Sequence, residues 1–480
     1  MIYKPVTCVW EVTMGCNMRC KHCGSSCEKF LPGELSTEEG YKFIDMCADM
    51  GLKWITLSGG EPLTRKDIPL LVKRIREKGI DANIITNGWN VTDDLAKKLK
   101  EAGVSVVAIS IDGTEEIHDS IRKKGSFARS KNAFEILEKN GIQTGCITTI
   151  TNKNLYCLNE LKKQLIDMGV ASWQVQIGLP MGNLAKNNDW VITPDKINYI
   201  IDFCYNVFLE DKIKIFPADC IGYYNKKLTE IINHTFNLNN DFIWDGCNAG
   251  KHGFGILHNG DILGCTSIRN KSFIEGNIKE KSLKEIWESK DLFKWNRQMT
   301  RSKLTGDCHT CKYADICLGG CANTRLSMNG SIYSENLYCS HNFLMKKFRE
   351  KLKTINDTNE LKNHADKMLA KENYQEAALT LDRLLDIHPK DVEFMGLKAF
   401  CEYMCGNIDI SEKLNNDILS IDPENYYAFQ GLGNIFLKKG NINKSINYLE
   451  KANKLTNGKN QDVLNDLNAA YKIKNEYAKN

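Results

Sequence analysis

Short apolar runs alternate with amphipathic stretches through the first half of the chain. The helical periodicity returns five times, and each time a glycine suited to a helix C-terminus follows. Mostly continuous apolar strands separated by helices are typical of a parallel sheet with covered faces. Six βα units are too few to close an eight-stranded barrel, so we predict an α/β fold, a partial (β/α)6 TIM-like barrel, over residues 1–240. The expected strands are Thr7–Val12, Trp54–Leu57, Ala82–Ile85, Val104–Ile111, Gln143–Ile150 and Trp173–Ile177. The expected helices are Thr37–Met50, Asp67–Glu77, Thr92–Glu101, Arg129–Lys139 and Leu155–Met168.

The pattern changes twice in the second half. Residues 241–350 are rich in glycine and cysteine and show few long helical periods, so we expect a small domain that needs metal to fold. In residues 355–480 three similar stretches follow one another, with Tyr374, Ile408 and Ile442 spaced 34 residues apart. This period resembles tetratricopeptide repeats, which are pairs of helices that stack into a binding surface. An ordinary helical bundle is the alternative.

Composition narrows the class of protein. The 480 residues carry a net charge of +4, which argues against a nucleic-acid-binding or membrane-surface protein. No apolar stretch approaches the ~20 residues that span a bilayer. Lys4 and Glu11 interrupt the N-terminal apolar run, so we predict no signal peptide and a cytoplasmic location. In a reducing cytosol, the 19 cysteines favour metal binding or catalysis over disulfides.

Three cysteines follow the first predicted strand, in the spacing Cys16-x3-Cys20-x2-Cys23. Soft thiolates suit iron–sulfur clusters, and three of them leave one corner of a 4Fe–4S cube open to another ligand. A structural zinc site is the alternative. It needs four ligands, and His22 or Cys27 would have to supply the fourth.

The spacing resembles that of radical S-adenosylmethionine (radical SAM) enzymes. Three further motifs match the family at the expected ends of later strands: LSGGEP (Leu57–Pro62), TNG (Thr86–Gly88) and SIDG (Ser110–Gly113). They should meet at the C-terminal edge of the sheet, where α/β folds bind ligands. The resemblance implies that SAM is contacted by His22, Gly59, Gly60, Glu61, Pro62, Asn87, Ser110, Asp112 and Thr148.

Two of these assignments have structural alternatives. In the family, the residue at the position of His22 packs near adenine, but a loop histidine facing solvent fits the sequence equally well. Arg122 follows SIDG and is a candidate for binding a carboxylate of SAM or of a peptide. Its alternative is an ion pair on the helix surface with Asp119 or Glu116.

The resemblance also implies the chemistry. The open iron of the cluster binds SAM, and an electron from a reductant such as flavodoxin or ferredoxin cleaves it to methionine and a 5′-deoxyadenosyl radical. That radical abstracts hydrogen from an unactivated carbon of the substrate. The cofactor carries the difficult step, and the protein positions the substrate. Oxygen-sensitive clusters favour an anaerobic host.

Seven downstream cysteines resemble the SPASM extension of radical SAM peptide-modifying enzymes, which holds two auxiliary 4Fe–4S clusters. By position, Cys247, Cys265 and Cys321 are assigned to the first auxiliary cluster. The second auxiliary cluster is assigned Cys308, Cys311, Cys317 and Cys339, which gives three clusters in all. The first therefore has either an open iron or a further ligand, for which Cys220 and His252 are candidates. Zinc is again the alternative, because paired C-x2-C cysteines are common in zinc sites.

The leading functional hypothesis is a radical SAM/SPASM peptide maturase. It would leave a thioether, a crosslink or an epimerised centre in a ribosomally made peptide gripped by the C-terminal repeats, with no nucleic acid or membrane as partner. A sulfatase-type formylglycine maturase is an alternative, weakened because Thr266 stands where those relatives usually carry an acidic residue. A haem or quinone-cofactor biosynthesis enzyme is another. An inactive scaffold would not need the open iron site. No catalytic residue is assigned.

Overall fold

The computed structural model describes residues 3–239 and 242–477, which form two compact units. The first unit contains Met1–Thr305 and Ile316–His341, and the second contains Gly306–Asp315 and Asn342–Asn480. Each unit is described by itself below.

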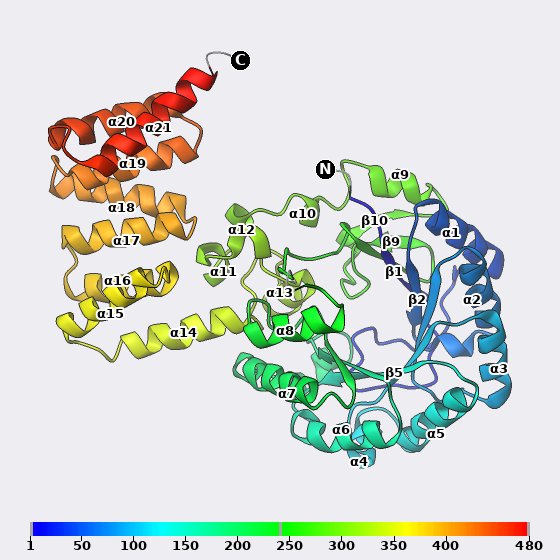
Figure 1. The fold of residues 1–480 in the computed structure, drawn as a ribbon. Helices are drawn as coiled ribbons and strands as arrows, with labels where there is room; N and C mark the ends of the chain where they lie inside the picture. Colours follow the sequence, from blue (N-terminus) through cyan, green and yellow to red (C-terminus); the bar gives the residue numbers. More distant parts are fainter. Residues whose placement is uncertain (1–2, 240–241, 478–480) are drawn as a thin grey trace. The chain divides into compact units, whose positions relative to one another are not determined.

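A parallel sheet forms the centre of the first unit. Its seven successive strands pair in chain order, and helices α1 to α7 lie around its outside (Figure 1). The strands are β1 Thr7–Thr13, β2 Trp54–Gly59, β3 Asp81–Thr86, β4 Val106–Ser110, β5 Thr144–Ile150, β6 Ser172–Ile177 and β7 Lys214–Pro217. The helices are α1 Thr37–Asp49, α2 Ile68–Glu77, α3 Asp93–Ala102, α4 Glu115–Ile121, α5 Ser126–Lys139, α6 Leu158–Asp167 and α7 Ile197–Glu210. The predicted α/β fold is confirmed.

Local signals explain where these helices begin and end. Ser36 precedes α1 and accepts a hydrogen bond from the Glu39 amide, while the Glu39 side chain accepts one from the Ser36 amide. This capping box satisfies two amides at the helix start. Another helix, α3, ends at Gly103, which adopts a left-handed conformation with φ of 84°.

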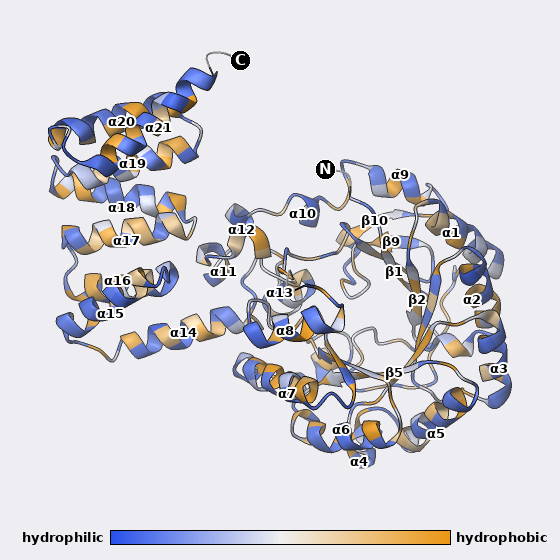
Figure 2. Ribbon diagram, in the orientation of Figure 1, coloured by the Kyte–Doolittle hydropathy of each residue, from blue (hydrophilic) through white to orange (hydrophobic). Residues whose placement is uncertain are grey.

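Apolar side chains such as Trp10 and Trp173 fill the layer between strands and helices, and Figure 2 shows the apolar stripes of the helices.

The sheet is larger than the sequence pattern predicted. The hairpin expected around Asn259–Cys265 forms from β8 Gly253–Ile256 and β9 Asp261–Leu263, and β10 Ile274–Asn277 pairs antiparallel with β9. However, β8 also pairs in parallel with β1, so the hairpin extends the same sheet. The sheet therefore continues past residue 240, where a domain boundary was predicted. Four-residue strands such as β7 and β8 are too short to show periodicity.

The rest of the first unit consists of short helices and loops around the cysteine-rich region. The α-helices are α8 Lys226–Thr235, α9 Leu283–Glu288, α10 Lys294–Arg297 and α13 Ala322–Asn329. Of the remaining elements, α11 Asp307–Thr310 and α12 Ala314–Cys317 lie near the boundaries of the units, and α14 Ser340–Leu352 leads into the second unit. Short 3-10 turns, such as the one over Pro62–Thr64, complete it.

Helix pairs build the second unit. They are α15 Thr358–Ala370 with α16 Tyr374–Ile387, α17 Val392–Met404 with α18 Ile408–Ile421, and α19 Tyr426–Lys438 with α20 Ile442–Leu455, followed by α21 Gln461–Tyr477. Tyr374, Ile408 and Ile442, which repeat every 34 residues, each begin the second helix of a pair. Pro389 and Pro423 lie in the turns after α16 and α18, because proline cannot continue a helix. The predicted all-helical C-terminal region is confirmed; its assignment to the tetratricopeptide family stays a prediction.

Across the part of the chain that the structure describes, no helix has both the length and the apolar character needed to cross a membrane.

Leu384 provides a test of the second unit. Its side chain is fully buried in a core that includes Leu361 and Phe394, so Leu384→Ala should cost about 2–5 kcal/mol. We expect faster hydrogen–deuterium exchange in α15 to α17 and unchanged exchange in α1 to α6. Lys390→Ala at an exposed position is the control and should leave both unchanged. Equal acceleration in the two units would contradict the division.

Candidate active site

The loop between β1 and α1 carries Cys16, Cys20 and Cys23, the three cysteines of the predicted SAM-binding cluster. It folds back on itself, with the Cys16 amide donating to the Glu28 carbonyl at 3.1 Å and the Cys23 amide donating to the Cys20 carbonyl at 3.2 Å. The Arg19 guanidinium donates to the carbonyls of Cys16 at 2.9 Å and Glu28 at 3.0 Å. Cys16, Cys20 and Cys23 are therefore held on one closed turn at the C-terminal end of β1.

The three sulfurs are close enough to influence one another. Burial raises the pKa of the Cys20 thiol to about 11, and the charges of Cys23 and Cys16 also raise it. Burial likewise raises the pKa of Cys16, with contributions from Glu61 and Cys23. Bringing three thiolates together is unfavourable unless cations compensate them, and an iron–sulfur cluster supplies those cations. The donor set therefore fits a cluster.

No three His, Cys, Asp or Glu side chains converge around a single metal ion within residues 3–239 and 242–477. That geometry belongs to mononuclear sites, whereas a cubane places each cysteine on a different iron.

The two glycines of LSGGEP lie against the backbone of the cluster loop. The Gly60 amide donates to the Thr13 carbonyl at 2.7 Å, and the Glu61 amide donates to the Gly15 carbonyl at 2.8 Å. A Cβ on Gly60 would lie 2.2 Å from the Gly15 oxygen, and one on Gly59 would lie 2.4 Å from the Thr13 oxygen. Larger residues would displace the loop. The sequence predicts that these glycines let the backbone approach a bound ligand. In the structure they also let the segment after β2 approach the backbone of the cluster loop.

Glu61 joins the ends of β2 and β3. Its buried carboxylate accepts hydrogen bonds from the Thr86 hydroxyl at 2.6 Å, the Asn87 amide at 2.7 Å and the Leu63 amide at 3.1 Å. The Asn87 side chain in turn donates to the Asn17 side chain of the cluster loop at 2.7 Å. The structure thus brings the second and third motifs together beside the cysteines. Pro62 begins the 3-10 turn that follows Glu61.

Asp112 is the centre of a buried charged network. Its carboxylate lies 2.9 Å from His22 Nε2 and accepts hydrogen bonds from Arg122 Nε at 2.5 Å and from the Thr149 amide at 2.9 Å. Its own amide donates to His118 Nδ1 at 3.1 Å. Burial would raise the pKa of the Asp112 carboxyl, but Arg122 and His22 hold it well below its usual range. Asp112 therefore stays ionised.

These contacts decide two open alternatives. His22 is buried against Asp112, so a loop histidine facing solvent is wrong. Arg122 pairs with Asp112, whereas Asp119 accepts hydrogen bonds from the Gly125 and Phe127 amides, so the surface pair is wrong too. Contact of His22 and Asp112 with SAM stays a prediction.

Ser110 and Thr148 have different surroundings. Ser110 is partly exposed at the C-terminal end of β4. Thr148 is fully buried, and its hydroxyl donates to the Ile111 carbonyl at 2.5 Å and accepts from the Trp173 indole at 2.8 Å. Thr148 therefore contacts the backbone of the SIDG motif at Ile111, and its contact with SAM stays a prediction. Thr149, the next residue of β5, points to the opposite face of the sheet, and its hydroxyl accepts a hydrogen bond from the Gln176 side chain at 3.0 Å. The alternation of side chains along the strands could have identified this pair.

The structure also brings together the three cysteines predicted to hold the first auxiliary cluster. Cys247 lies before β8, Cys265 follows β9, and Cys321 immediately precedes α13. Burial raises the pKa of Cys247 to about 12 and that of Cys265 to about 11, and the nearby Cys321 also raises both. The backbone amides of Ala249 and Ala322 lower the pKa of Cys247 in part. Three soft donors with amide support again fit a cluster.

The four cysteines of the second auxiliary cluster are divided between the units. Cys308 and Cys311 belong to the second unit, where their sulfurs accept hydrogen bonds from the Asn342 side chain and the Tyr313 amide, both at 3.4 Å. Cys317 and Cys339 belong to the first unit. Their joint binding of a cluster stays a prediction.

Family comparisons identify the two cysteine regions. Residues 10–163 match the radical SAM superfamily, and residues 247–312 match the SPASM iron–sulfur cluster-binding domain. The chain belongs to the radical SAM family. Its cofactors are S-adenosylmethionine and iron–sulfur clusters; their number stays a prediction.

Relatives with different activities resemble this radical SAM protein. The AdoMet-dependent heme synthase of Oleidesulfovibrio alaskensis is 30% identical over 69% of this chain and 86% of the relative. Mycofactocin maturase MftC of Mycolicibacterium smegmatis is 28% identical over 66% of this chain and 78% of the relative. The solved structure of native anSMEcpe with bound AdoMet and Cp18Cys peptide has a TM-score of 0.56 and 22% identity, covering 70% of this chain and 95% of the other. That likeness shows the fold.

One ion pair of the radical SAM protein was not found from the sequence. Arg269, just after Cys265, donates to the Glu11 carboxylate at the end of β1 and to the Ser25 hydroxyl of the cluster loop. Burial raises the pKa of the Glu11 carboxyl, and Arg269 lowers it in part. The pair connects the loop that carries Cys16, Cys20 and Cys23 to the loop that follows Cys265. No local pattern could reveal a contact between residues so distant in the chain.

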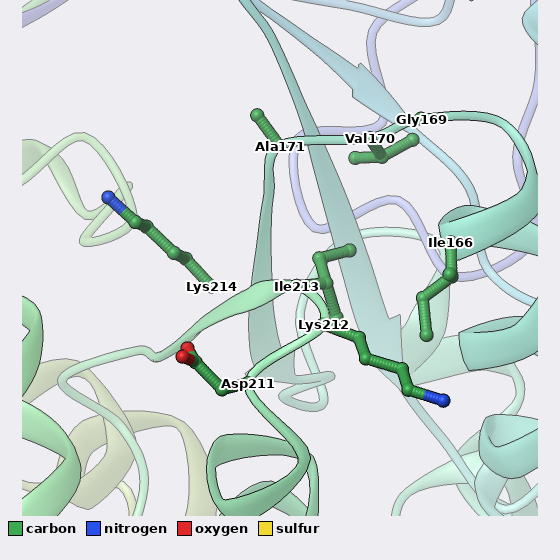
Figure 3. A pocket seen from close by; sticks show the side chains of 8 residues that line it. All are labelled: Ile166, Gly169, Val170, Ala171, Asp211, Lys212, Ile213 and Lys214. Carbon is green, nitrogen blue, oxygen red and sulfur yellow. The ribbon is translucent and has the colours of Figure 1, made fainter.

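Figure 3 shows the lining of a pocket of about 330 Å³ in the first unit. Its lining comes from Ile166 and residues 169–171 and 211–214, where β6 and β7 begin. The radical SAM motifs follow the opposite, C-terminal ends of the strands. The pocket therefore contains none of the predicted site residues.

Removing Arg269 should destabilise the first unit. Arg269→Ala leaves the buried Glu11 carboxylate without its cation, which should cost about 3 kcal/mol. Urea unfolding followed by tryptophan fluorescence measures this, because all 8 tryptophans lie in the first unit. Adding Glu11→Gln should recover part of the loss. Arg76→Ala, which removes an exposed pair with Asp81, is the control and should change stability little. An equal loss in both arginine variants would contradict the argument.

His118 should make the first unit less stable in mild acid. Burial, and then the charge of Arg122, lowers the pKa of His118 to about 4, whereas an unfolded histidine titrates near about 6.5. Between these values the unfolded state binds more protons, so the free energy of unfolding falls as pH falls. We expect His118→Gln to show a shallower loss in urea unfolding between pH 7 and pH 5. His234→Gln at an exposed position should keep the wild-type slope.

Proposed function

We propose that this radical SAM enzyme is a peptide maturase that abstracts hydrogen from a residue of a ribosomally made peptide. The observation that carries the proposal is the second unit, whose stacked helix pairs form a surface beyond the regions that match the family models. Repeats of helix pairs commonly bind extended peptides. Exposed Phe400 and Met404 on α17 and Tyr427 on α19 are apolar side chains that suit this role.

The chain's own residues prepare the cofactor site. Cys16, Cys20 and Cys23 would hold the cluster whose open iron binds SAM, which supplies the 5′-deoxyadenosyl radical. Glu61 fixes the ends of β2 and β3 relative to the cluster loop. Asp112 orients His22 beside Cys23, and its network is buried, so these side chains need little reorganisation when SAM binds.

Haem biosynthesis is the second candidate. It is favoured by the 30% identity with the heme synthase, a relative that this chain covers over 86% of its length. Substrate tests distinguish the two activities.

The first test asks whether the chain cleaves SAM. With dithionite as reductant, the anaerobically reconstituted wild-type protein should form 5′-deoxyadenosine and methionine. The triple variant Cys16→Ala, Cys20→Ala, Cys23→Ala should form neither, because it lacks the cluster ligands. Cys204→Ala, which removes a buried thiol on α7, should retain the activity. Turnover by the triple variant would refute the radical SAM mechanism.

The second test distinguishes peptide from haem chemistry. Short peptides encoded beside the gene, and separately an iron porphyrin, are incubated with enzyme and SAM and examined by mass spectrometry. A mass change only in a peptide supports the maturase. The triple variant Phe400→Ala, Met404→Ala, Tyr427→Ala should then raise the peptide's KM by about tenfold or more, consistent with losing several apolar contacts. Leu209→Ala with Phe236→Ala, exposed apolar residues of the first unit, is the matched control. Conversion of the porphyrin alone would favour the haem enzyme.

A further inference from the structure

The turn after β7 is fastened to the loop that carries Cys321. Tyr223 lies in this turn, with its side chain buried and a positive φ of 75°. Its hydroxyl accepts the Cys321 amide at 2.8 Å and the Asn336 side chain at 3.0 Å, and donates to the Asp219 carbonyl at 3.1 Å. A non-glycine residue adopts this conformation at an energetic cost, so surrounding contacts must hold it.

The same turn is held from its other side. The Gly222 amide donates to the Tyr338 carbonyl at 3.3 Å, and the Ser340 amide donates to the Gly222 carbonyl at 2.9 Å. Gly320, next to Cys321, lies so close to the Tyr223 ring that a Cβ there would be 2.4 Å from it. The turn therefore cannot move independently of the Cys321 loop.

Cys220 lies inside this clamped turn. Its sulfur accepts a hydrogen bond from the Ile177 amide at 3.4 Å. The Tyr223 hydroxyl donates to the carbonyl of Asp219, the residue before Cys220, and accepts the Cys321 amide, so one hydroxyl bridges the two cysteine segments. Amide donors to sulfur are a regular part of the surroundings of cluster ligands. Cys247 and Cys265 pack against the apolar cluster of Ile268, Ala322 and Ile332, and Ala322 directly follows Cys321, so the four cysteines lie in one region.

His252, the other candidate ligand, has a different neighbourhood. Its carbonyl accepts the Val6 and Thr7 amides at the start of β1, and its ring lies edge-on to Tyr3 at 6.2 Å between centroids. These contacts direct the residue toward the start of the sheet. Cys220 remains the candidate that the fold brings to Cys321.

We propose that Cys220 is the fourth protein ligand of the first auxiliary cluster, completing the set Cys220, Cys247, Cys265 and Cys321. Binding replaces the S–H bond with an S–Fe bond and releases a proton, with no change in oxidation state. A fully cysteine-ligated cluster has no free iron for a substrate thiolate. This role rests on the auxiliary cluster of the proposed enzyme, but not on whether its substrate is a peptide or a porphyrin.

The test isolates the auxiliary clusters by using the Cys16→Ala, Cys20→Ala, Cys23→Ala chain as parent. Into it are placed Cys220→Ala, Cys220→Ser and, as control, Cys204→Ala, which removes a buried thiol on α7. Iron content and the electron paramagnetic resonance spectrum of the dithionite-reduced protein are recorded with and without added 2-mercaptoethanol. Circular dichroism establishes that each variant is folded.

We expect the spectra of the parent and of Cys204→Ala to stay unchanged when 2-mercaptoethanol is added. Cys220→Ala should either lose about four irons or acquire a spectrum that shifts when the thiol binds the freed iron. Cys220→Ser should keep its iron with an altered spectrum, which separates ligation from a folding defect. Iron content and spectra of Cys220→Ala identical to those of the parent, or a parent spectrum that itself shifts with the thiol, would overturn the assignment. A folded parent without iron would overturn the auxiliary cluster itself, and with it this ligand.

Discussion

Buried charge at the C-terminal ends of the strands is the constraint on which the site depends. Glu11, Glu61 and Asp112 are each almost completely excluded from solvent, and an unpaired carboxylate there would be costly. Each is compensated differently. Glu11 meets Arg269, Glu61 accepts hydrogen bonds from the chain around Thr86, and Asp112 meets both Arg122 and His22. Because the compensating groups come from separate elements, the charges hold the motifs in place.

This arrangement explains why the cysteine loop needs so much support. Burial and the charge of Cys23 raise the pKa of both Cys16 and Cys20, so the loop is electrostatically unfavourable until cations reach it. The backbone bonds from Gly60 and Glu61 resist that strain by fastening the loop to β2. Close approach of two backbones is possible there only because Gly59 and Gly60 have no Cβ. The same glycines therefore stabilise the cluster loop whether or not a ligand is bound.

The sheet itself connects the two cluster regions of the first unit. Pairing of β8 with β1 places the hairpin that precedes Cys265 beside the strand that precedes Cys16. Arg269 then spans the short distance between the loops that follow. The strand pairing and the ion pair together fix the spacing of the two loops. The rigidity comes from ladder hydrogen bonds and one buried ion pair.

The sequence by itself determined the features that depend on near neighbours. Alternation of apolar runs located six strands, the spacing of Tyr374, Ile408 and Ile442 marked the starts of three helices, and the motifs identified the family. Only the tertiary structure placed β8 beside β1, Arg269 on Glu11, and Cys220 in a turn fastened to Cys321. It also showed that the buried Thr148 hydroxyl joins neighbouring strands by hydrogen bonds to the Ile111 carbonyl and the Trp173 indole. Periodicity and spacing are local properties, whereas these contacts join residues far apart in the chain and exist only once the sheet has formed.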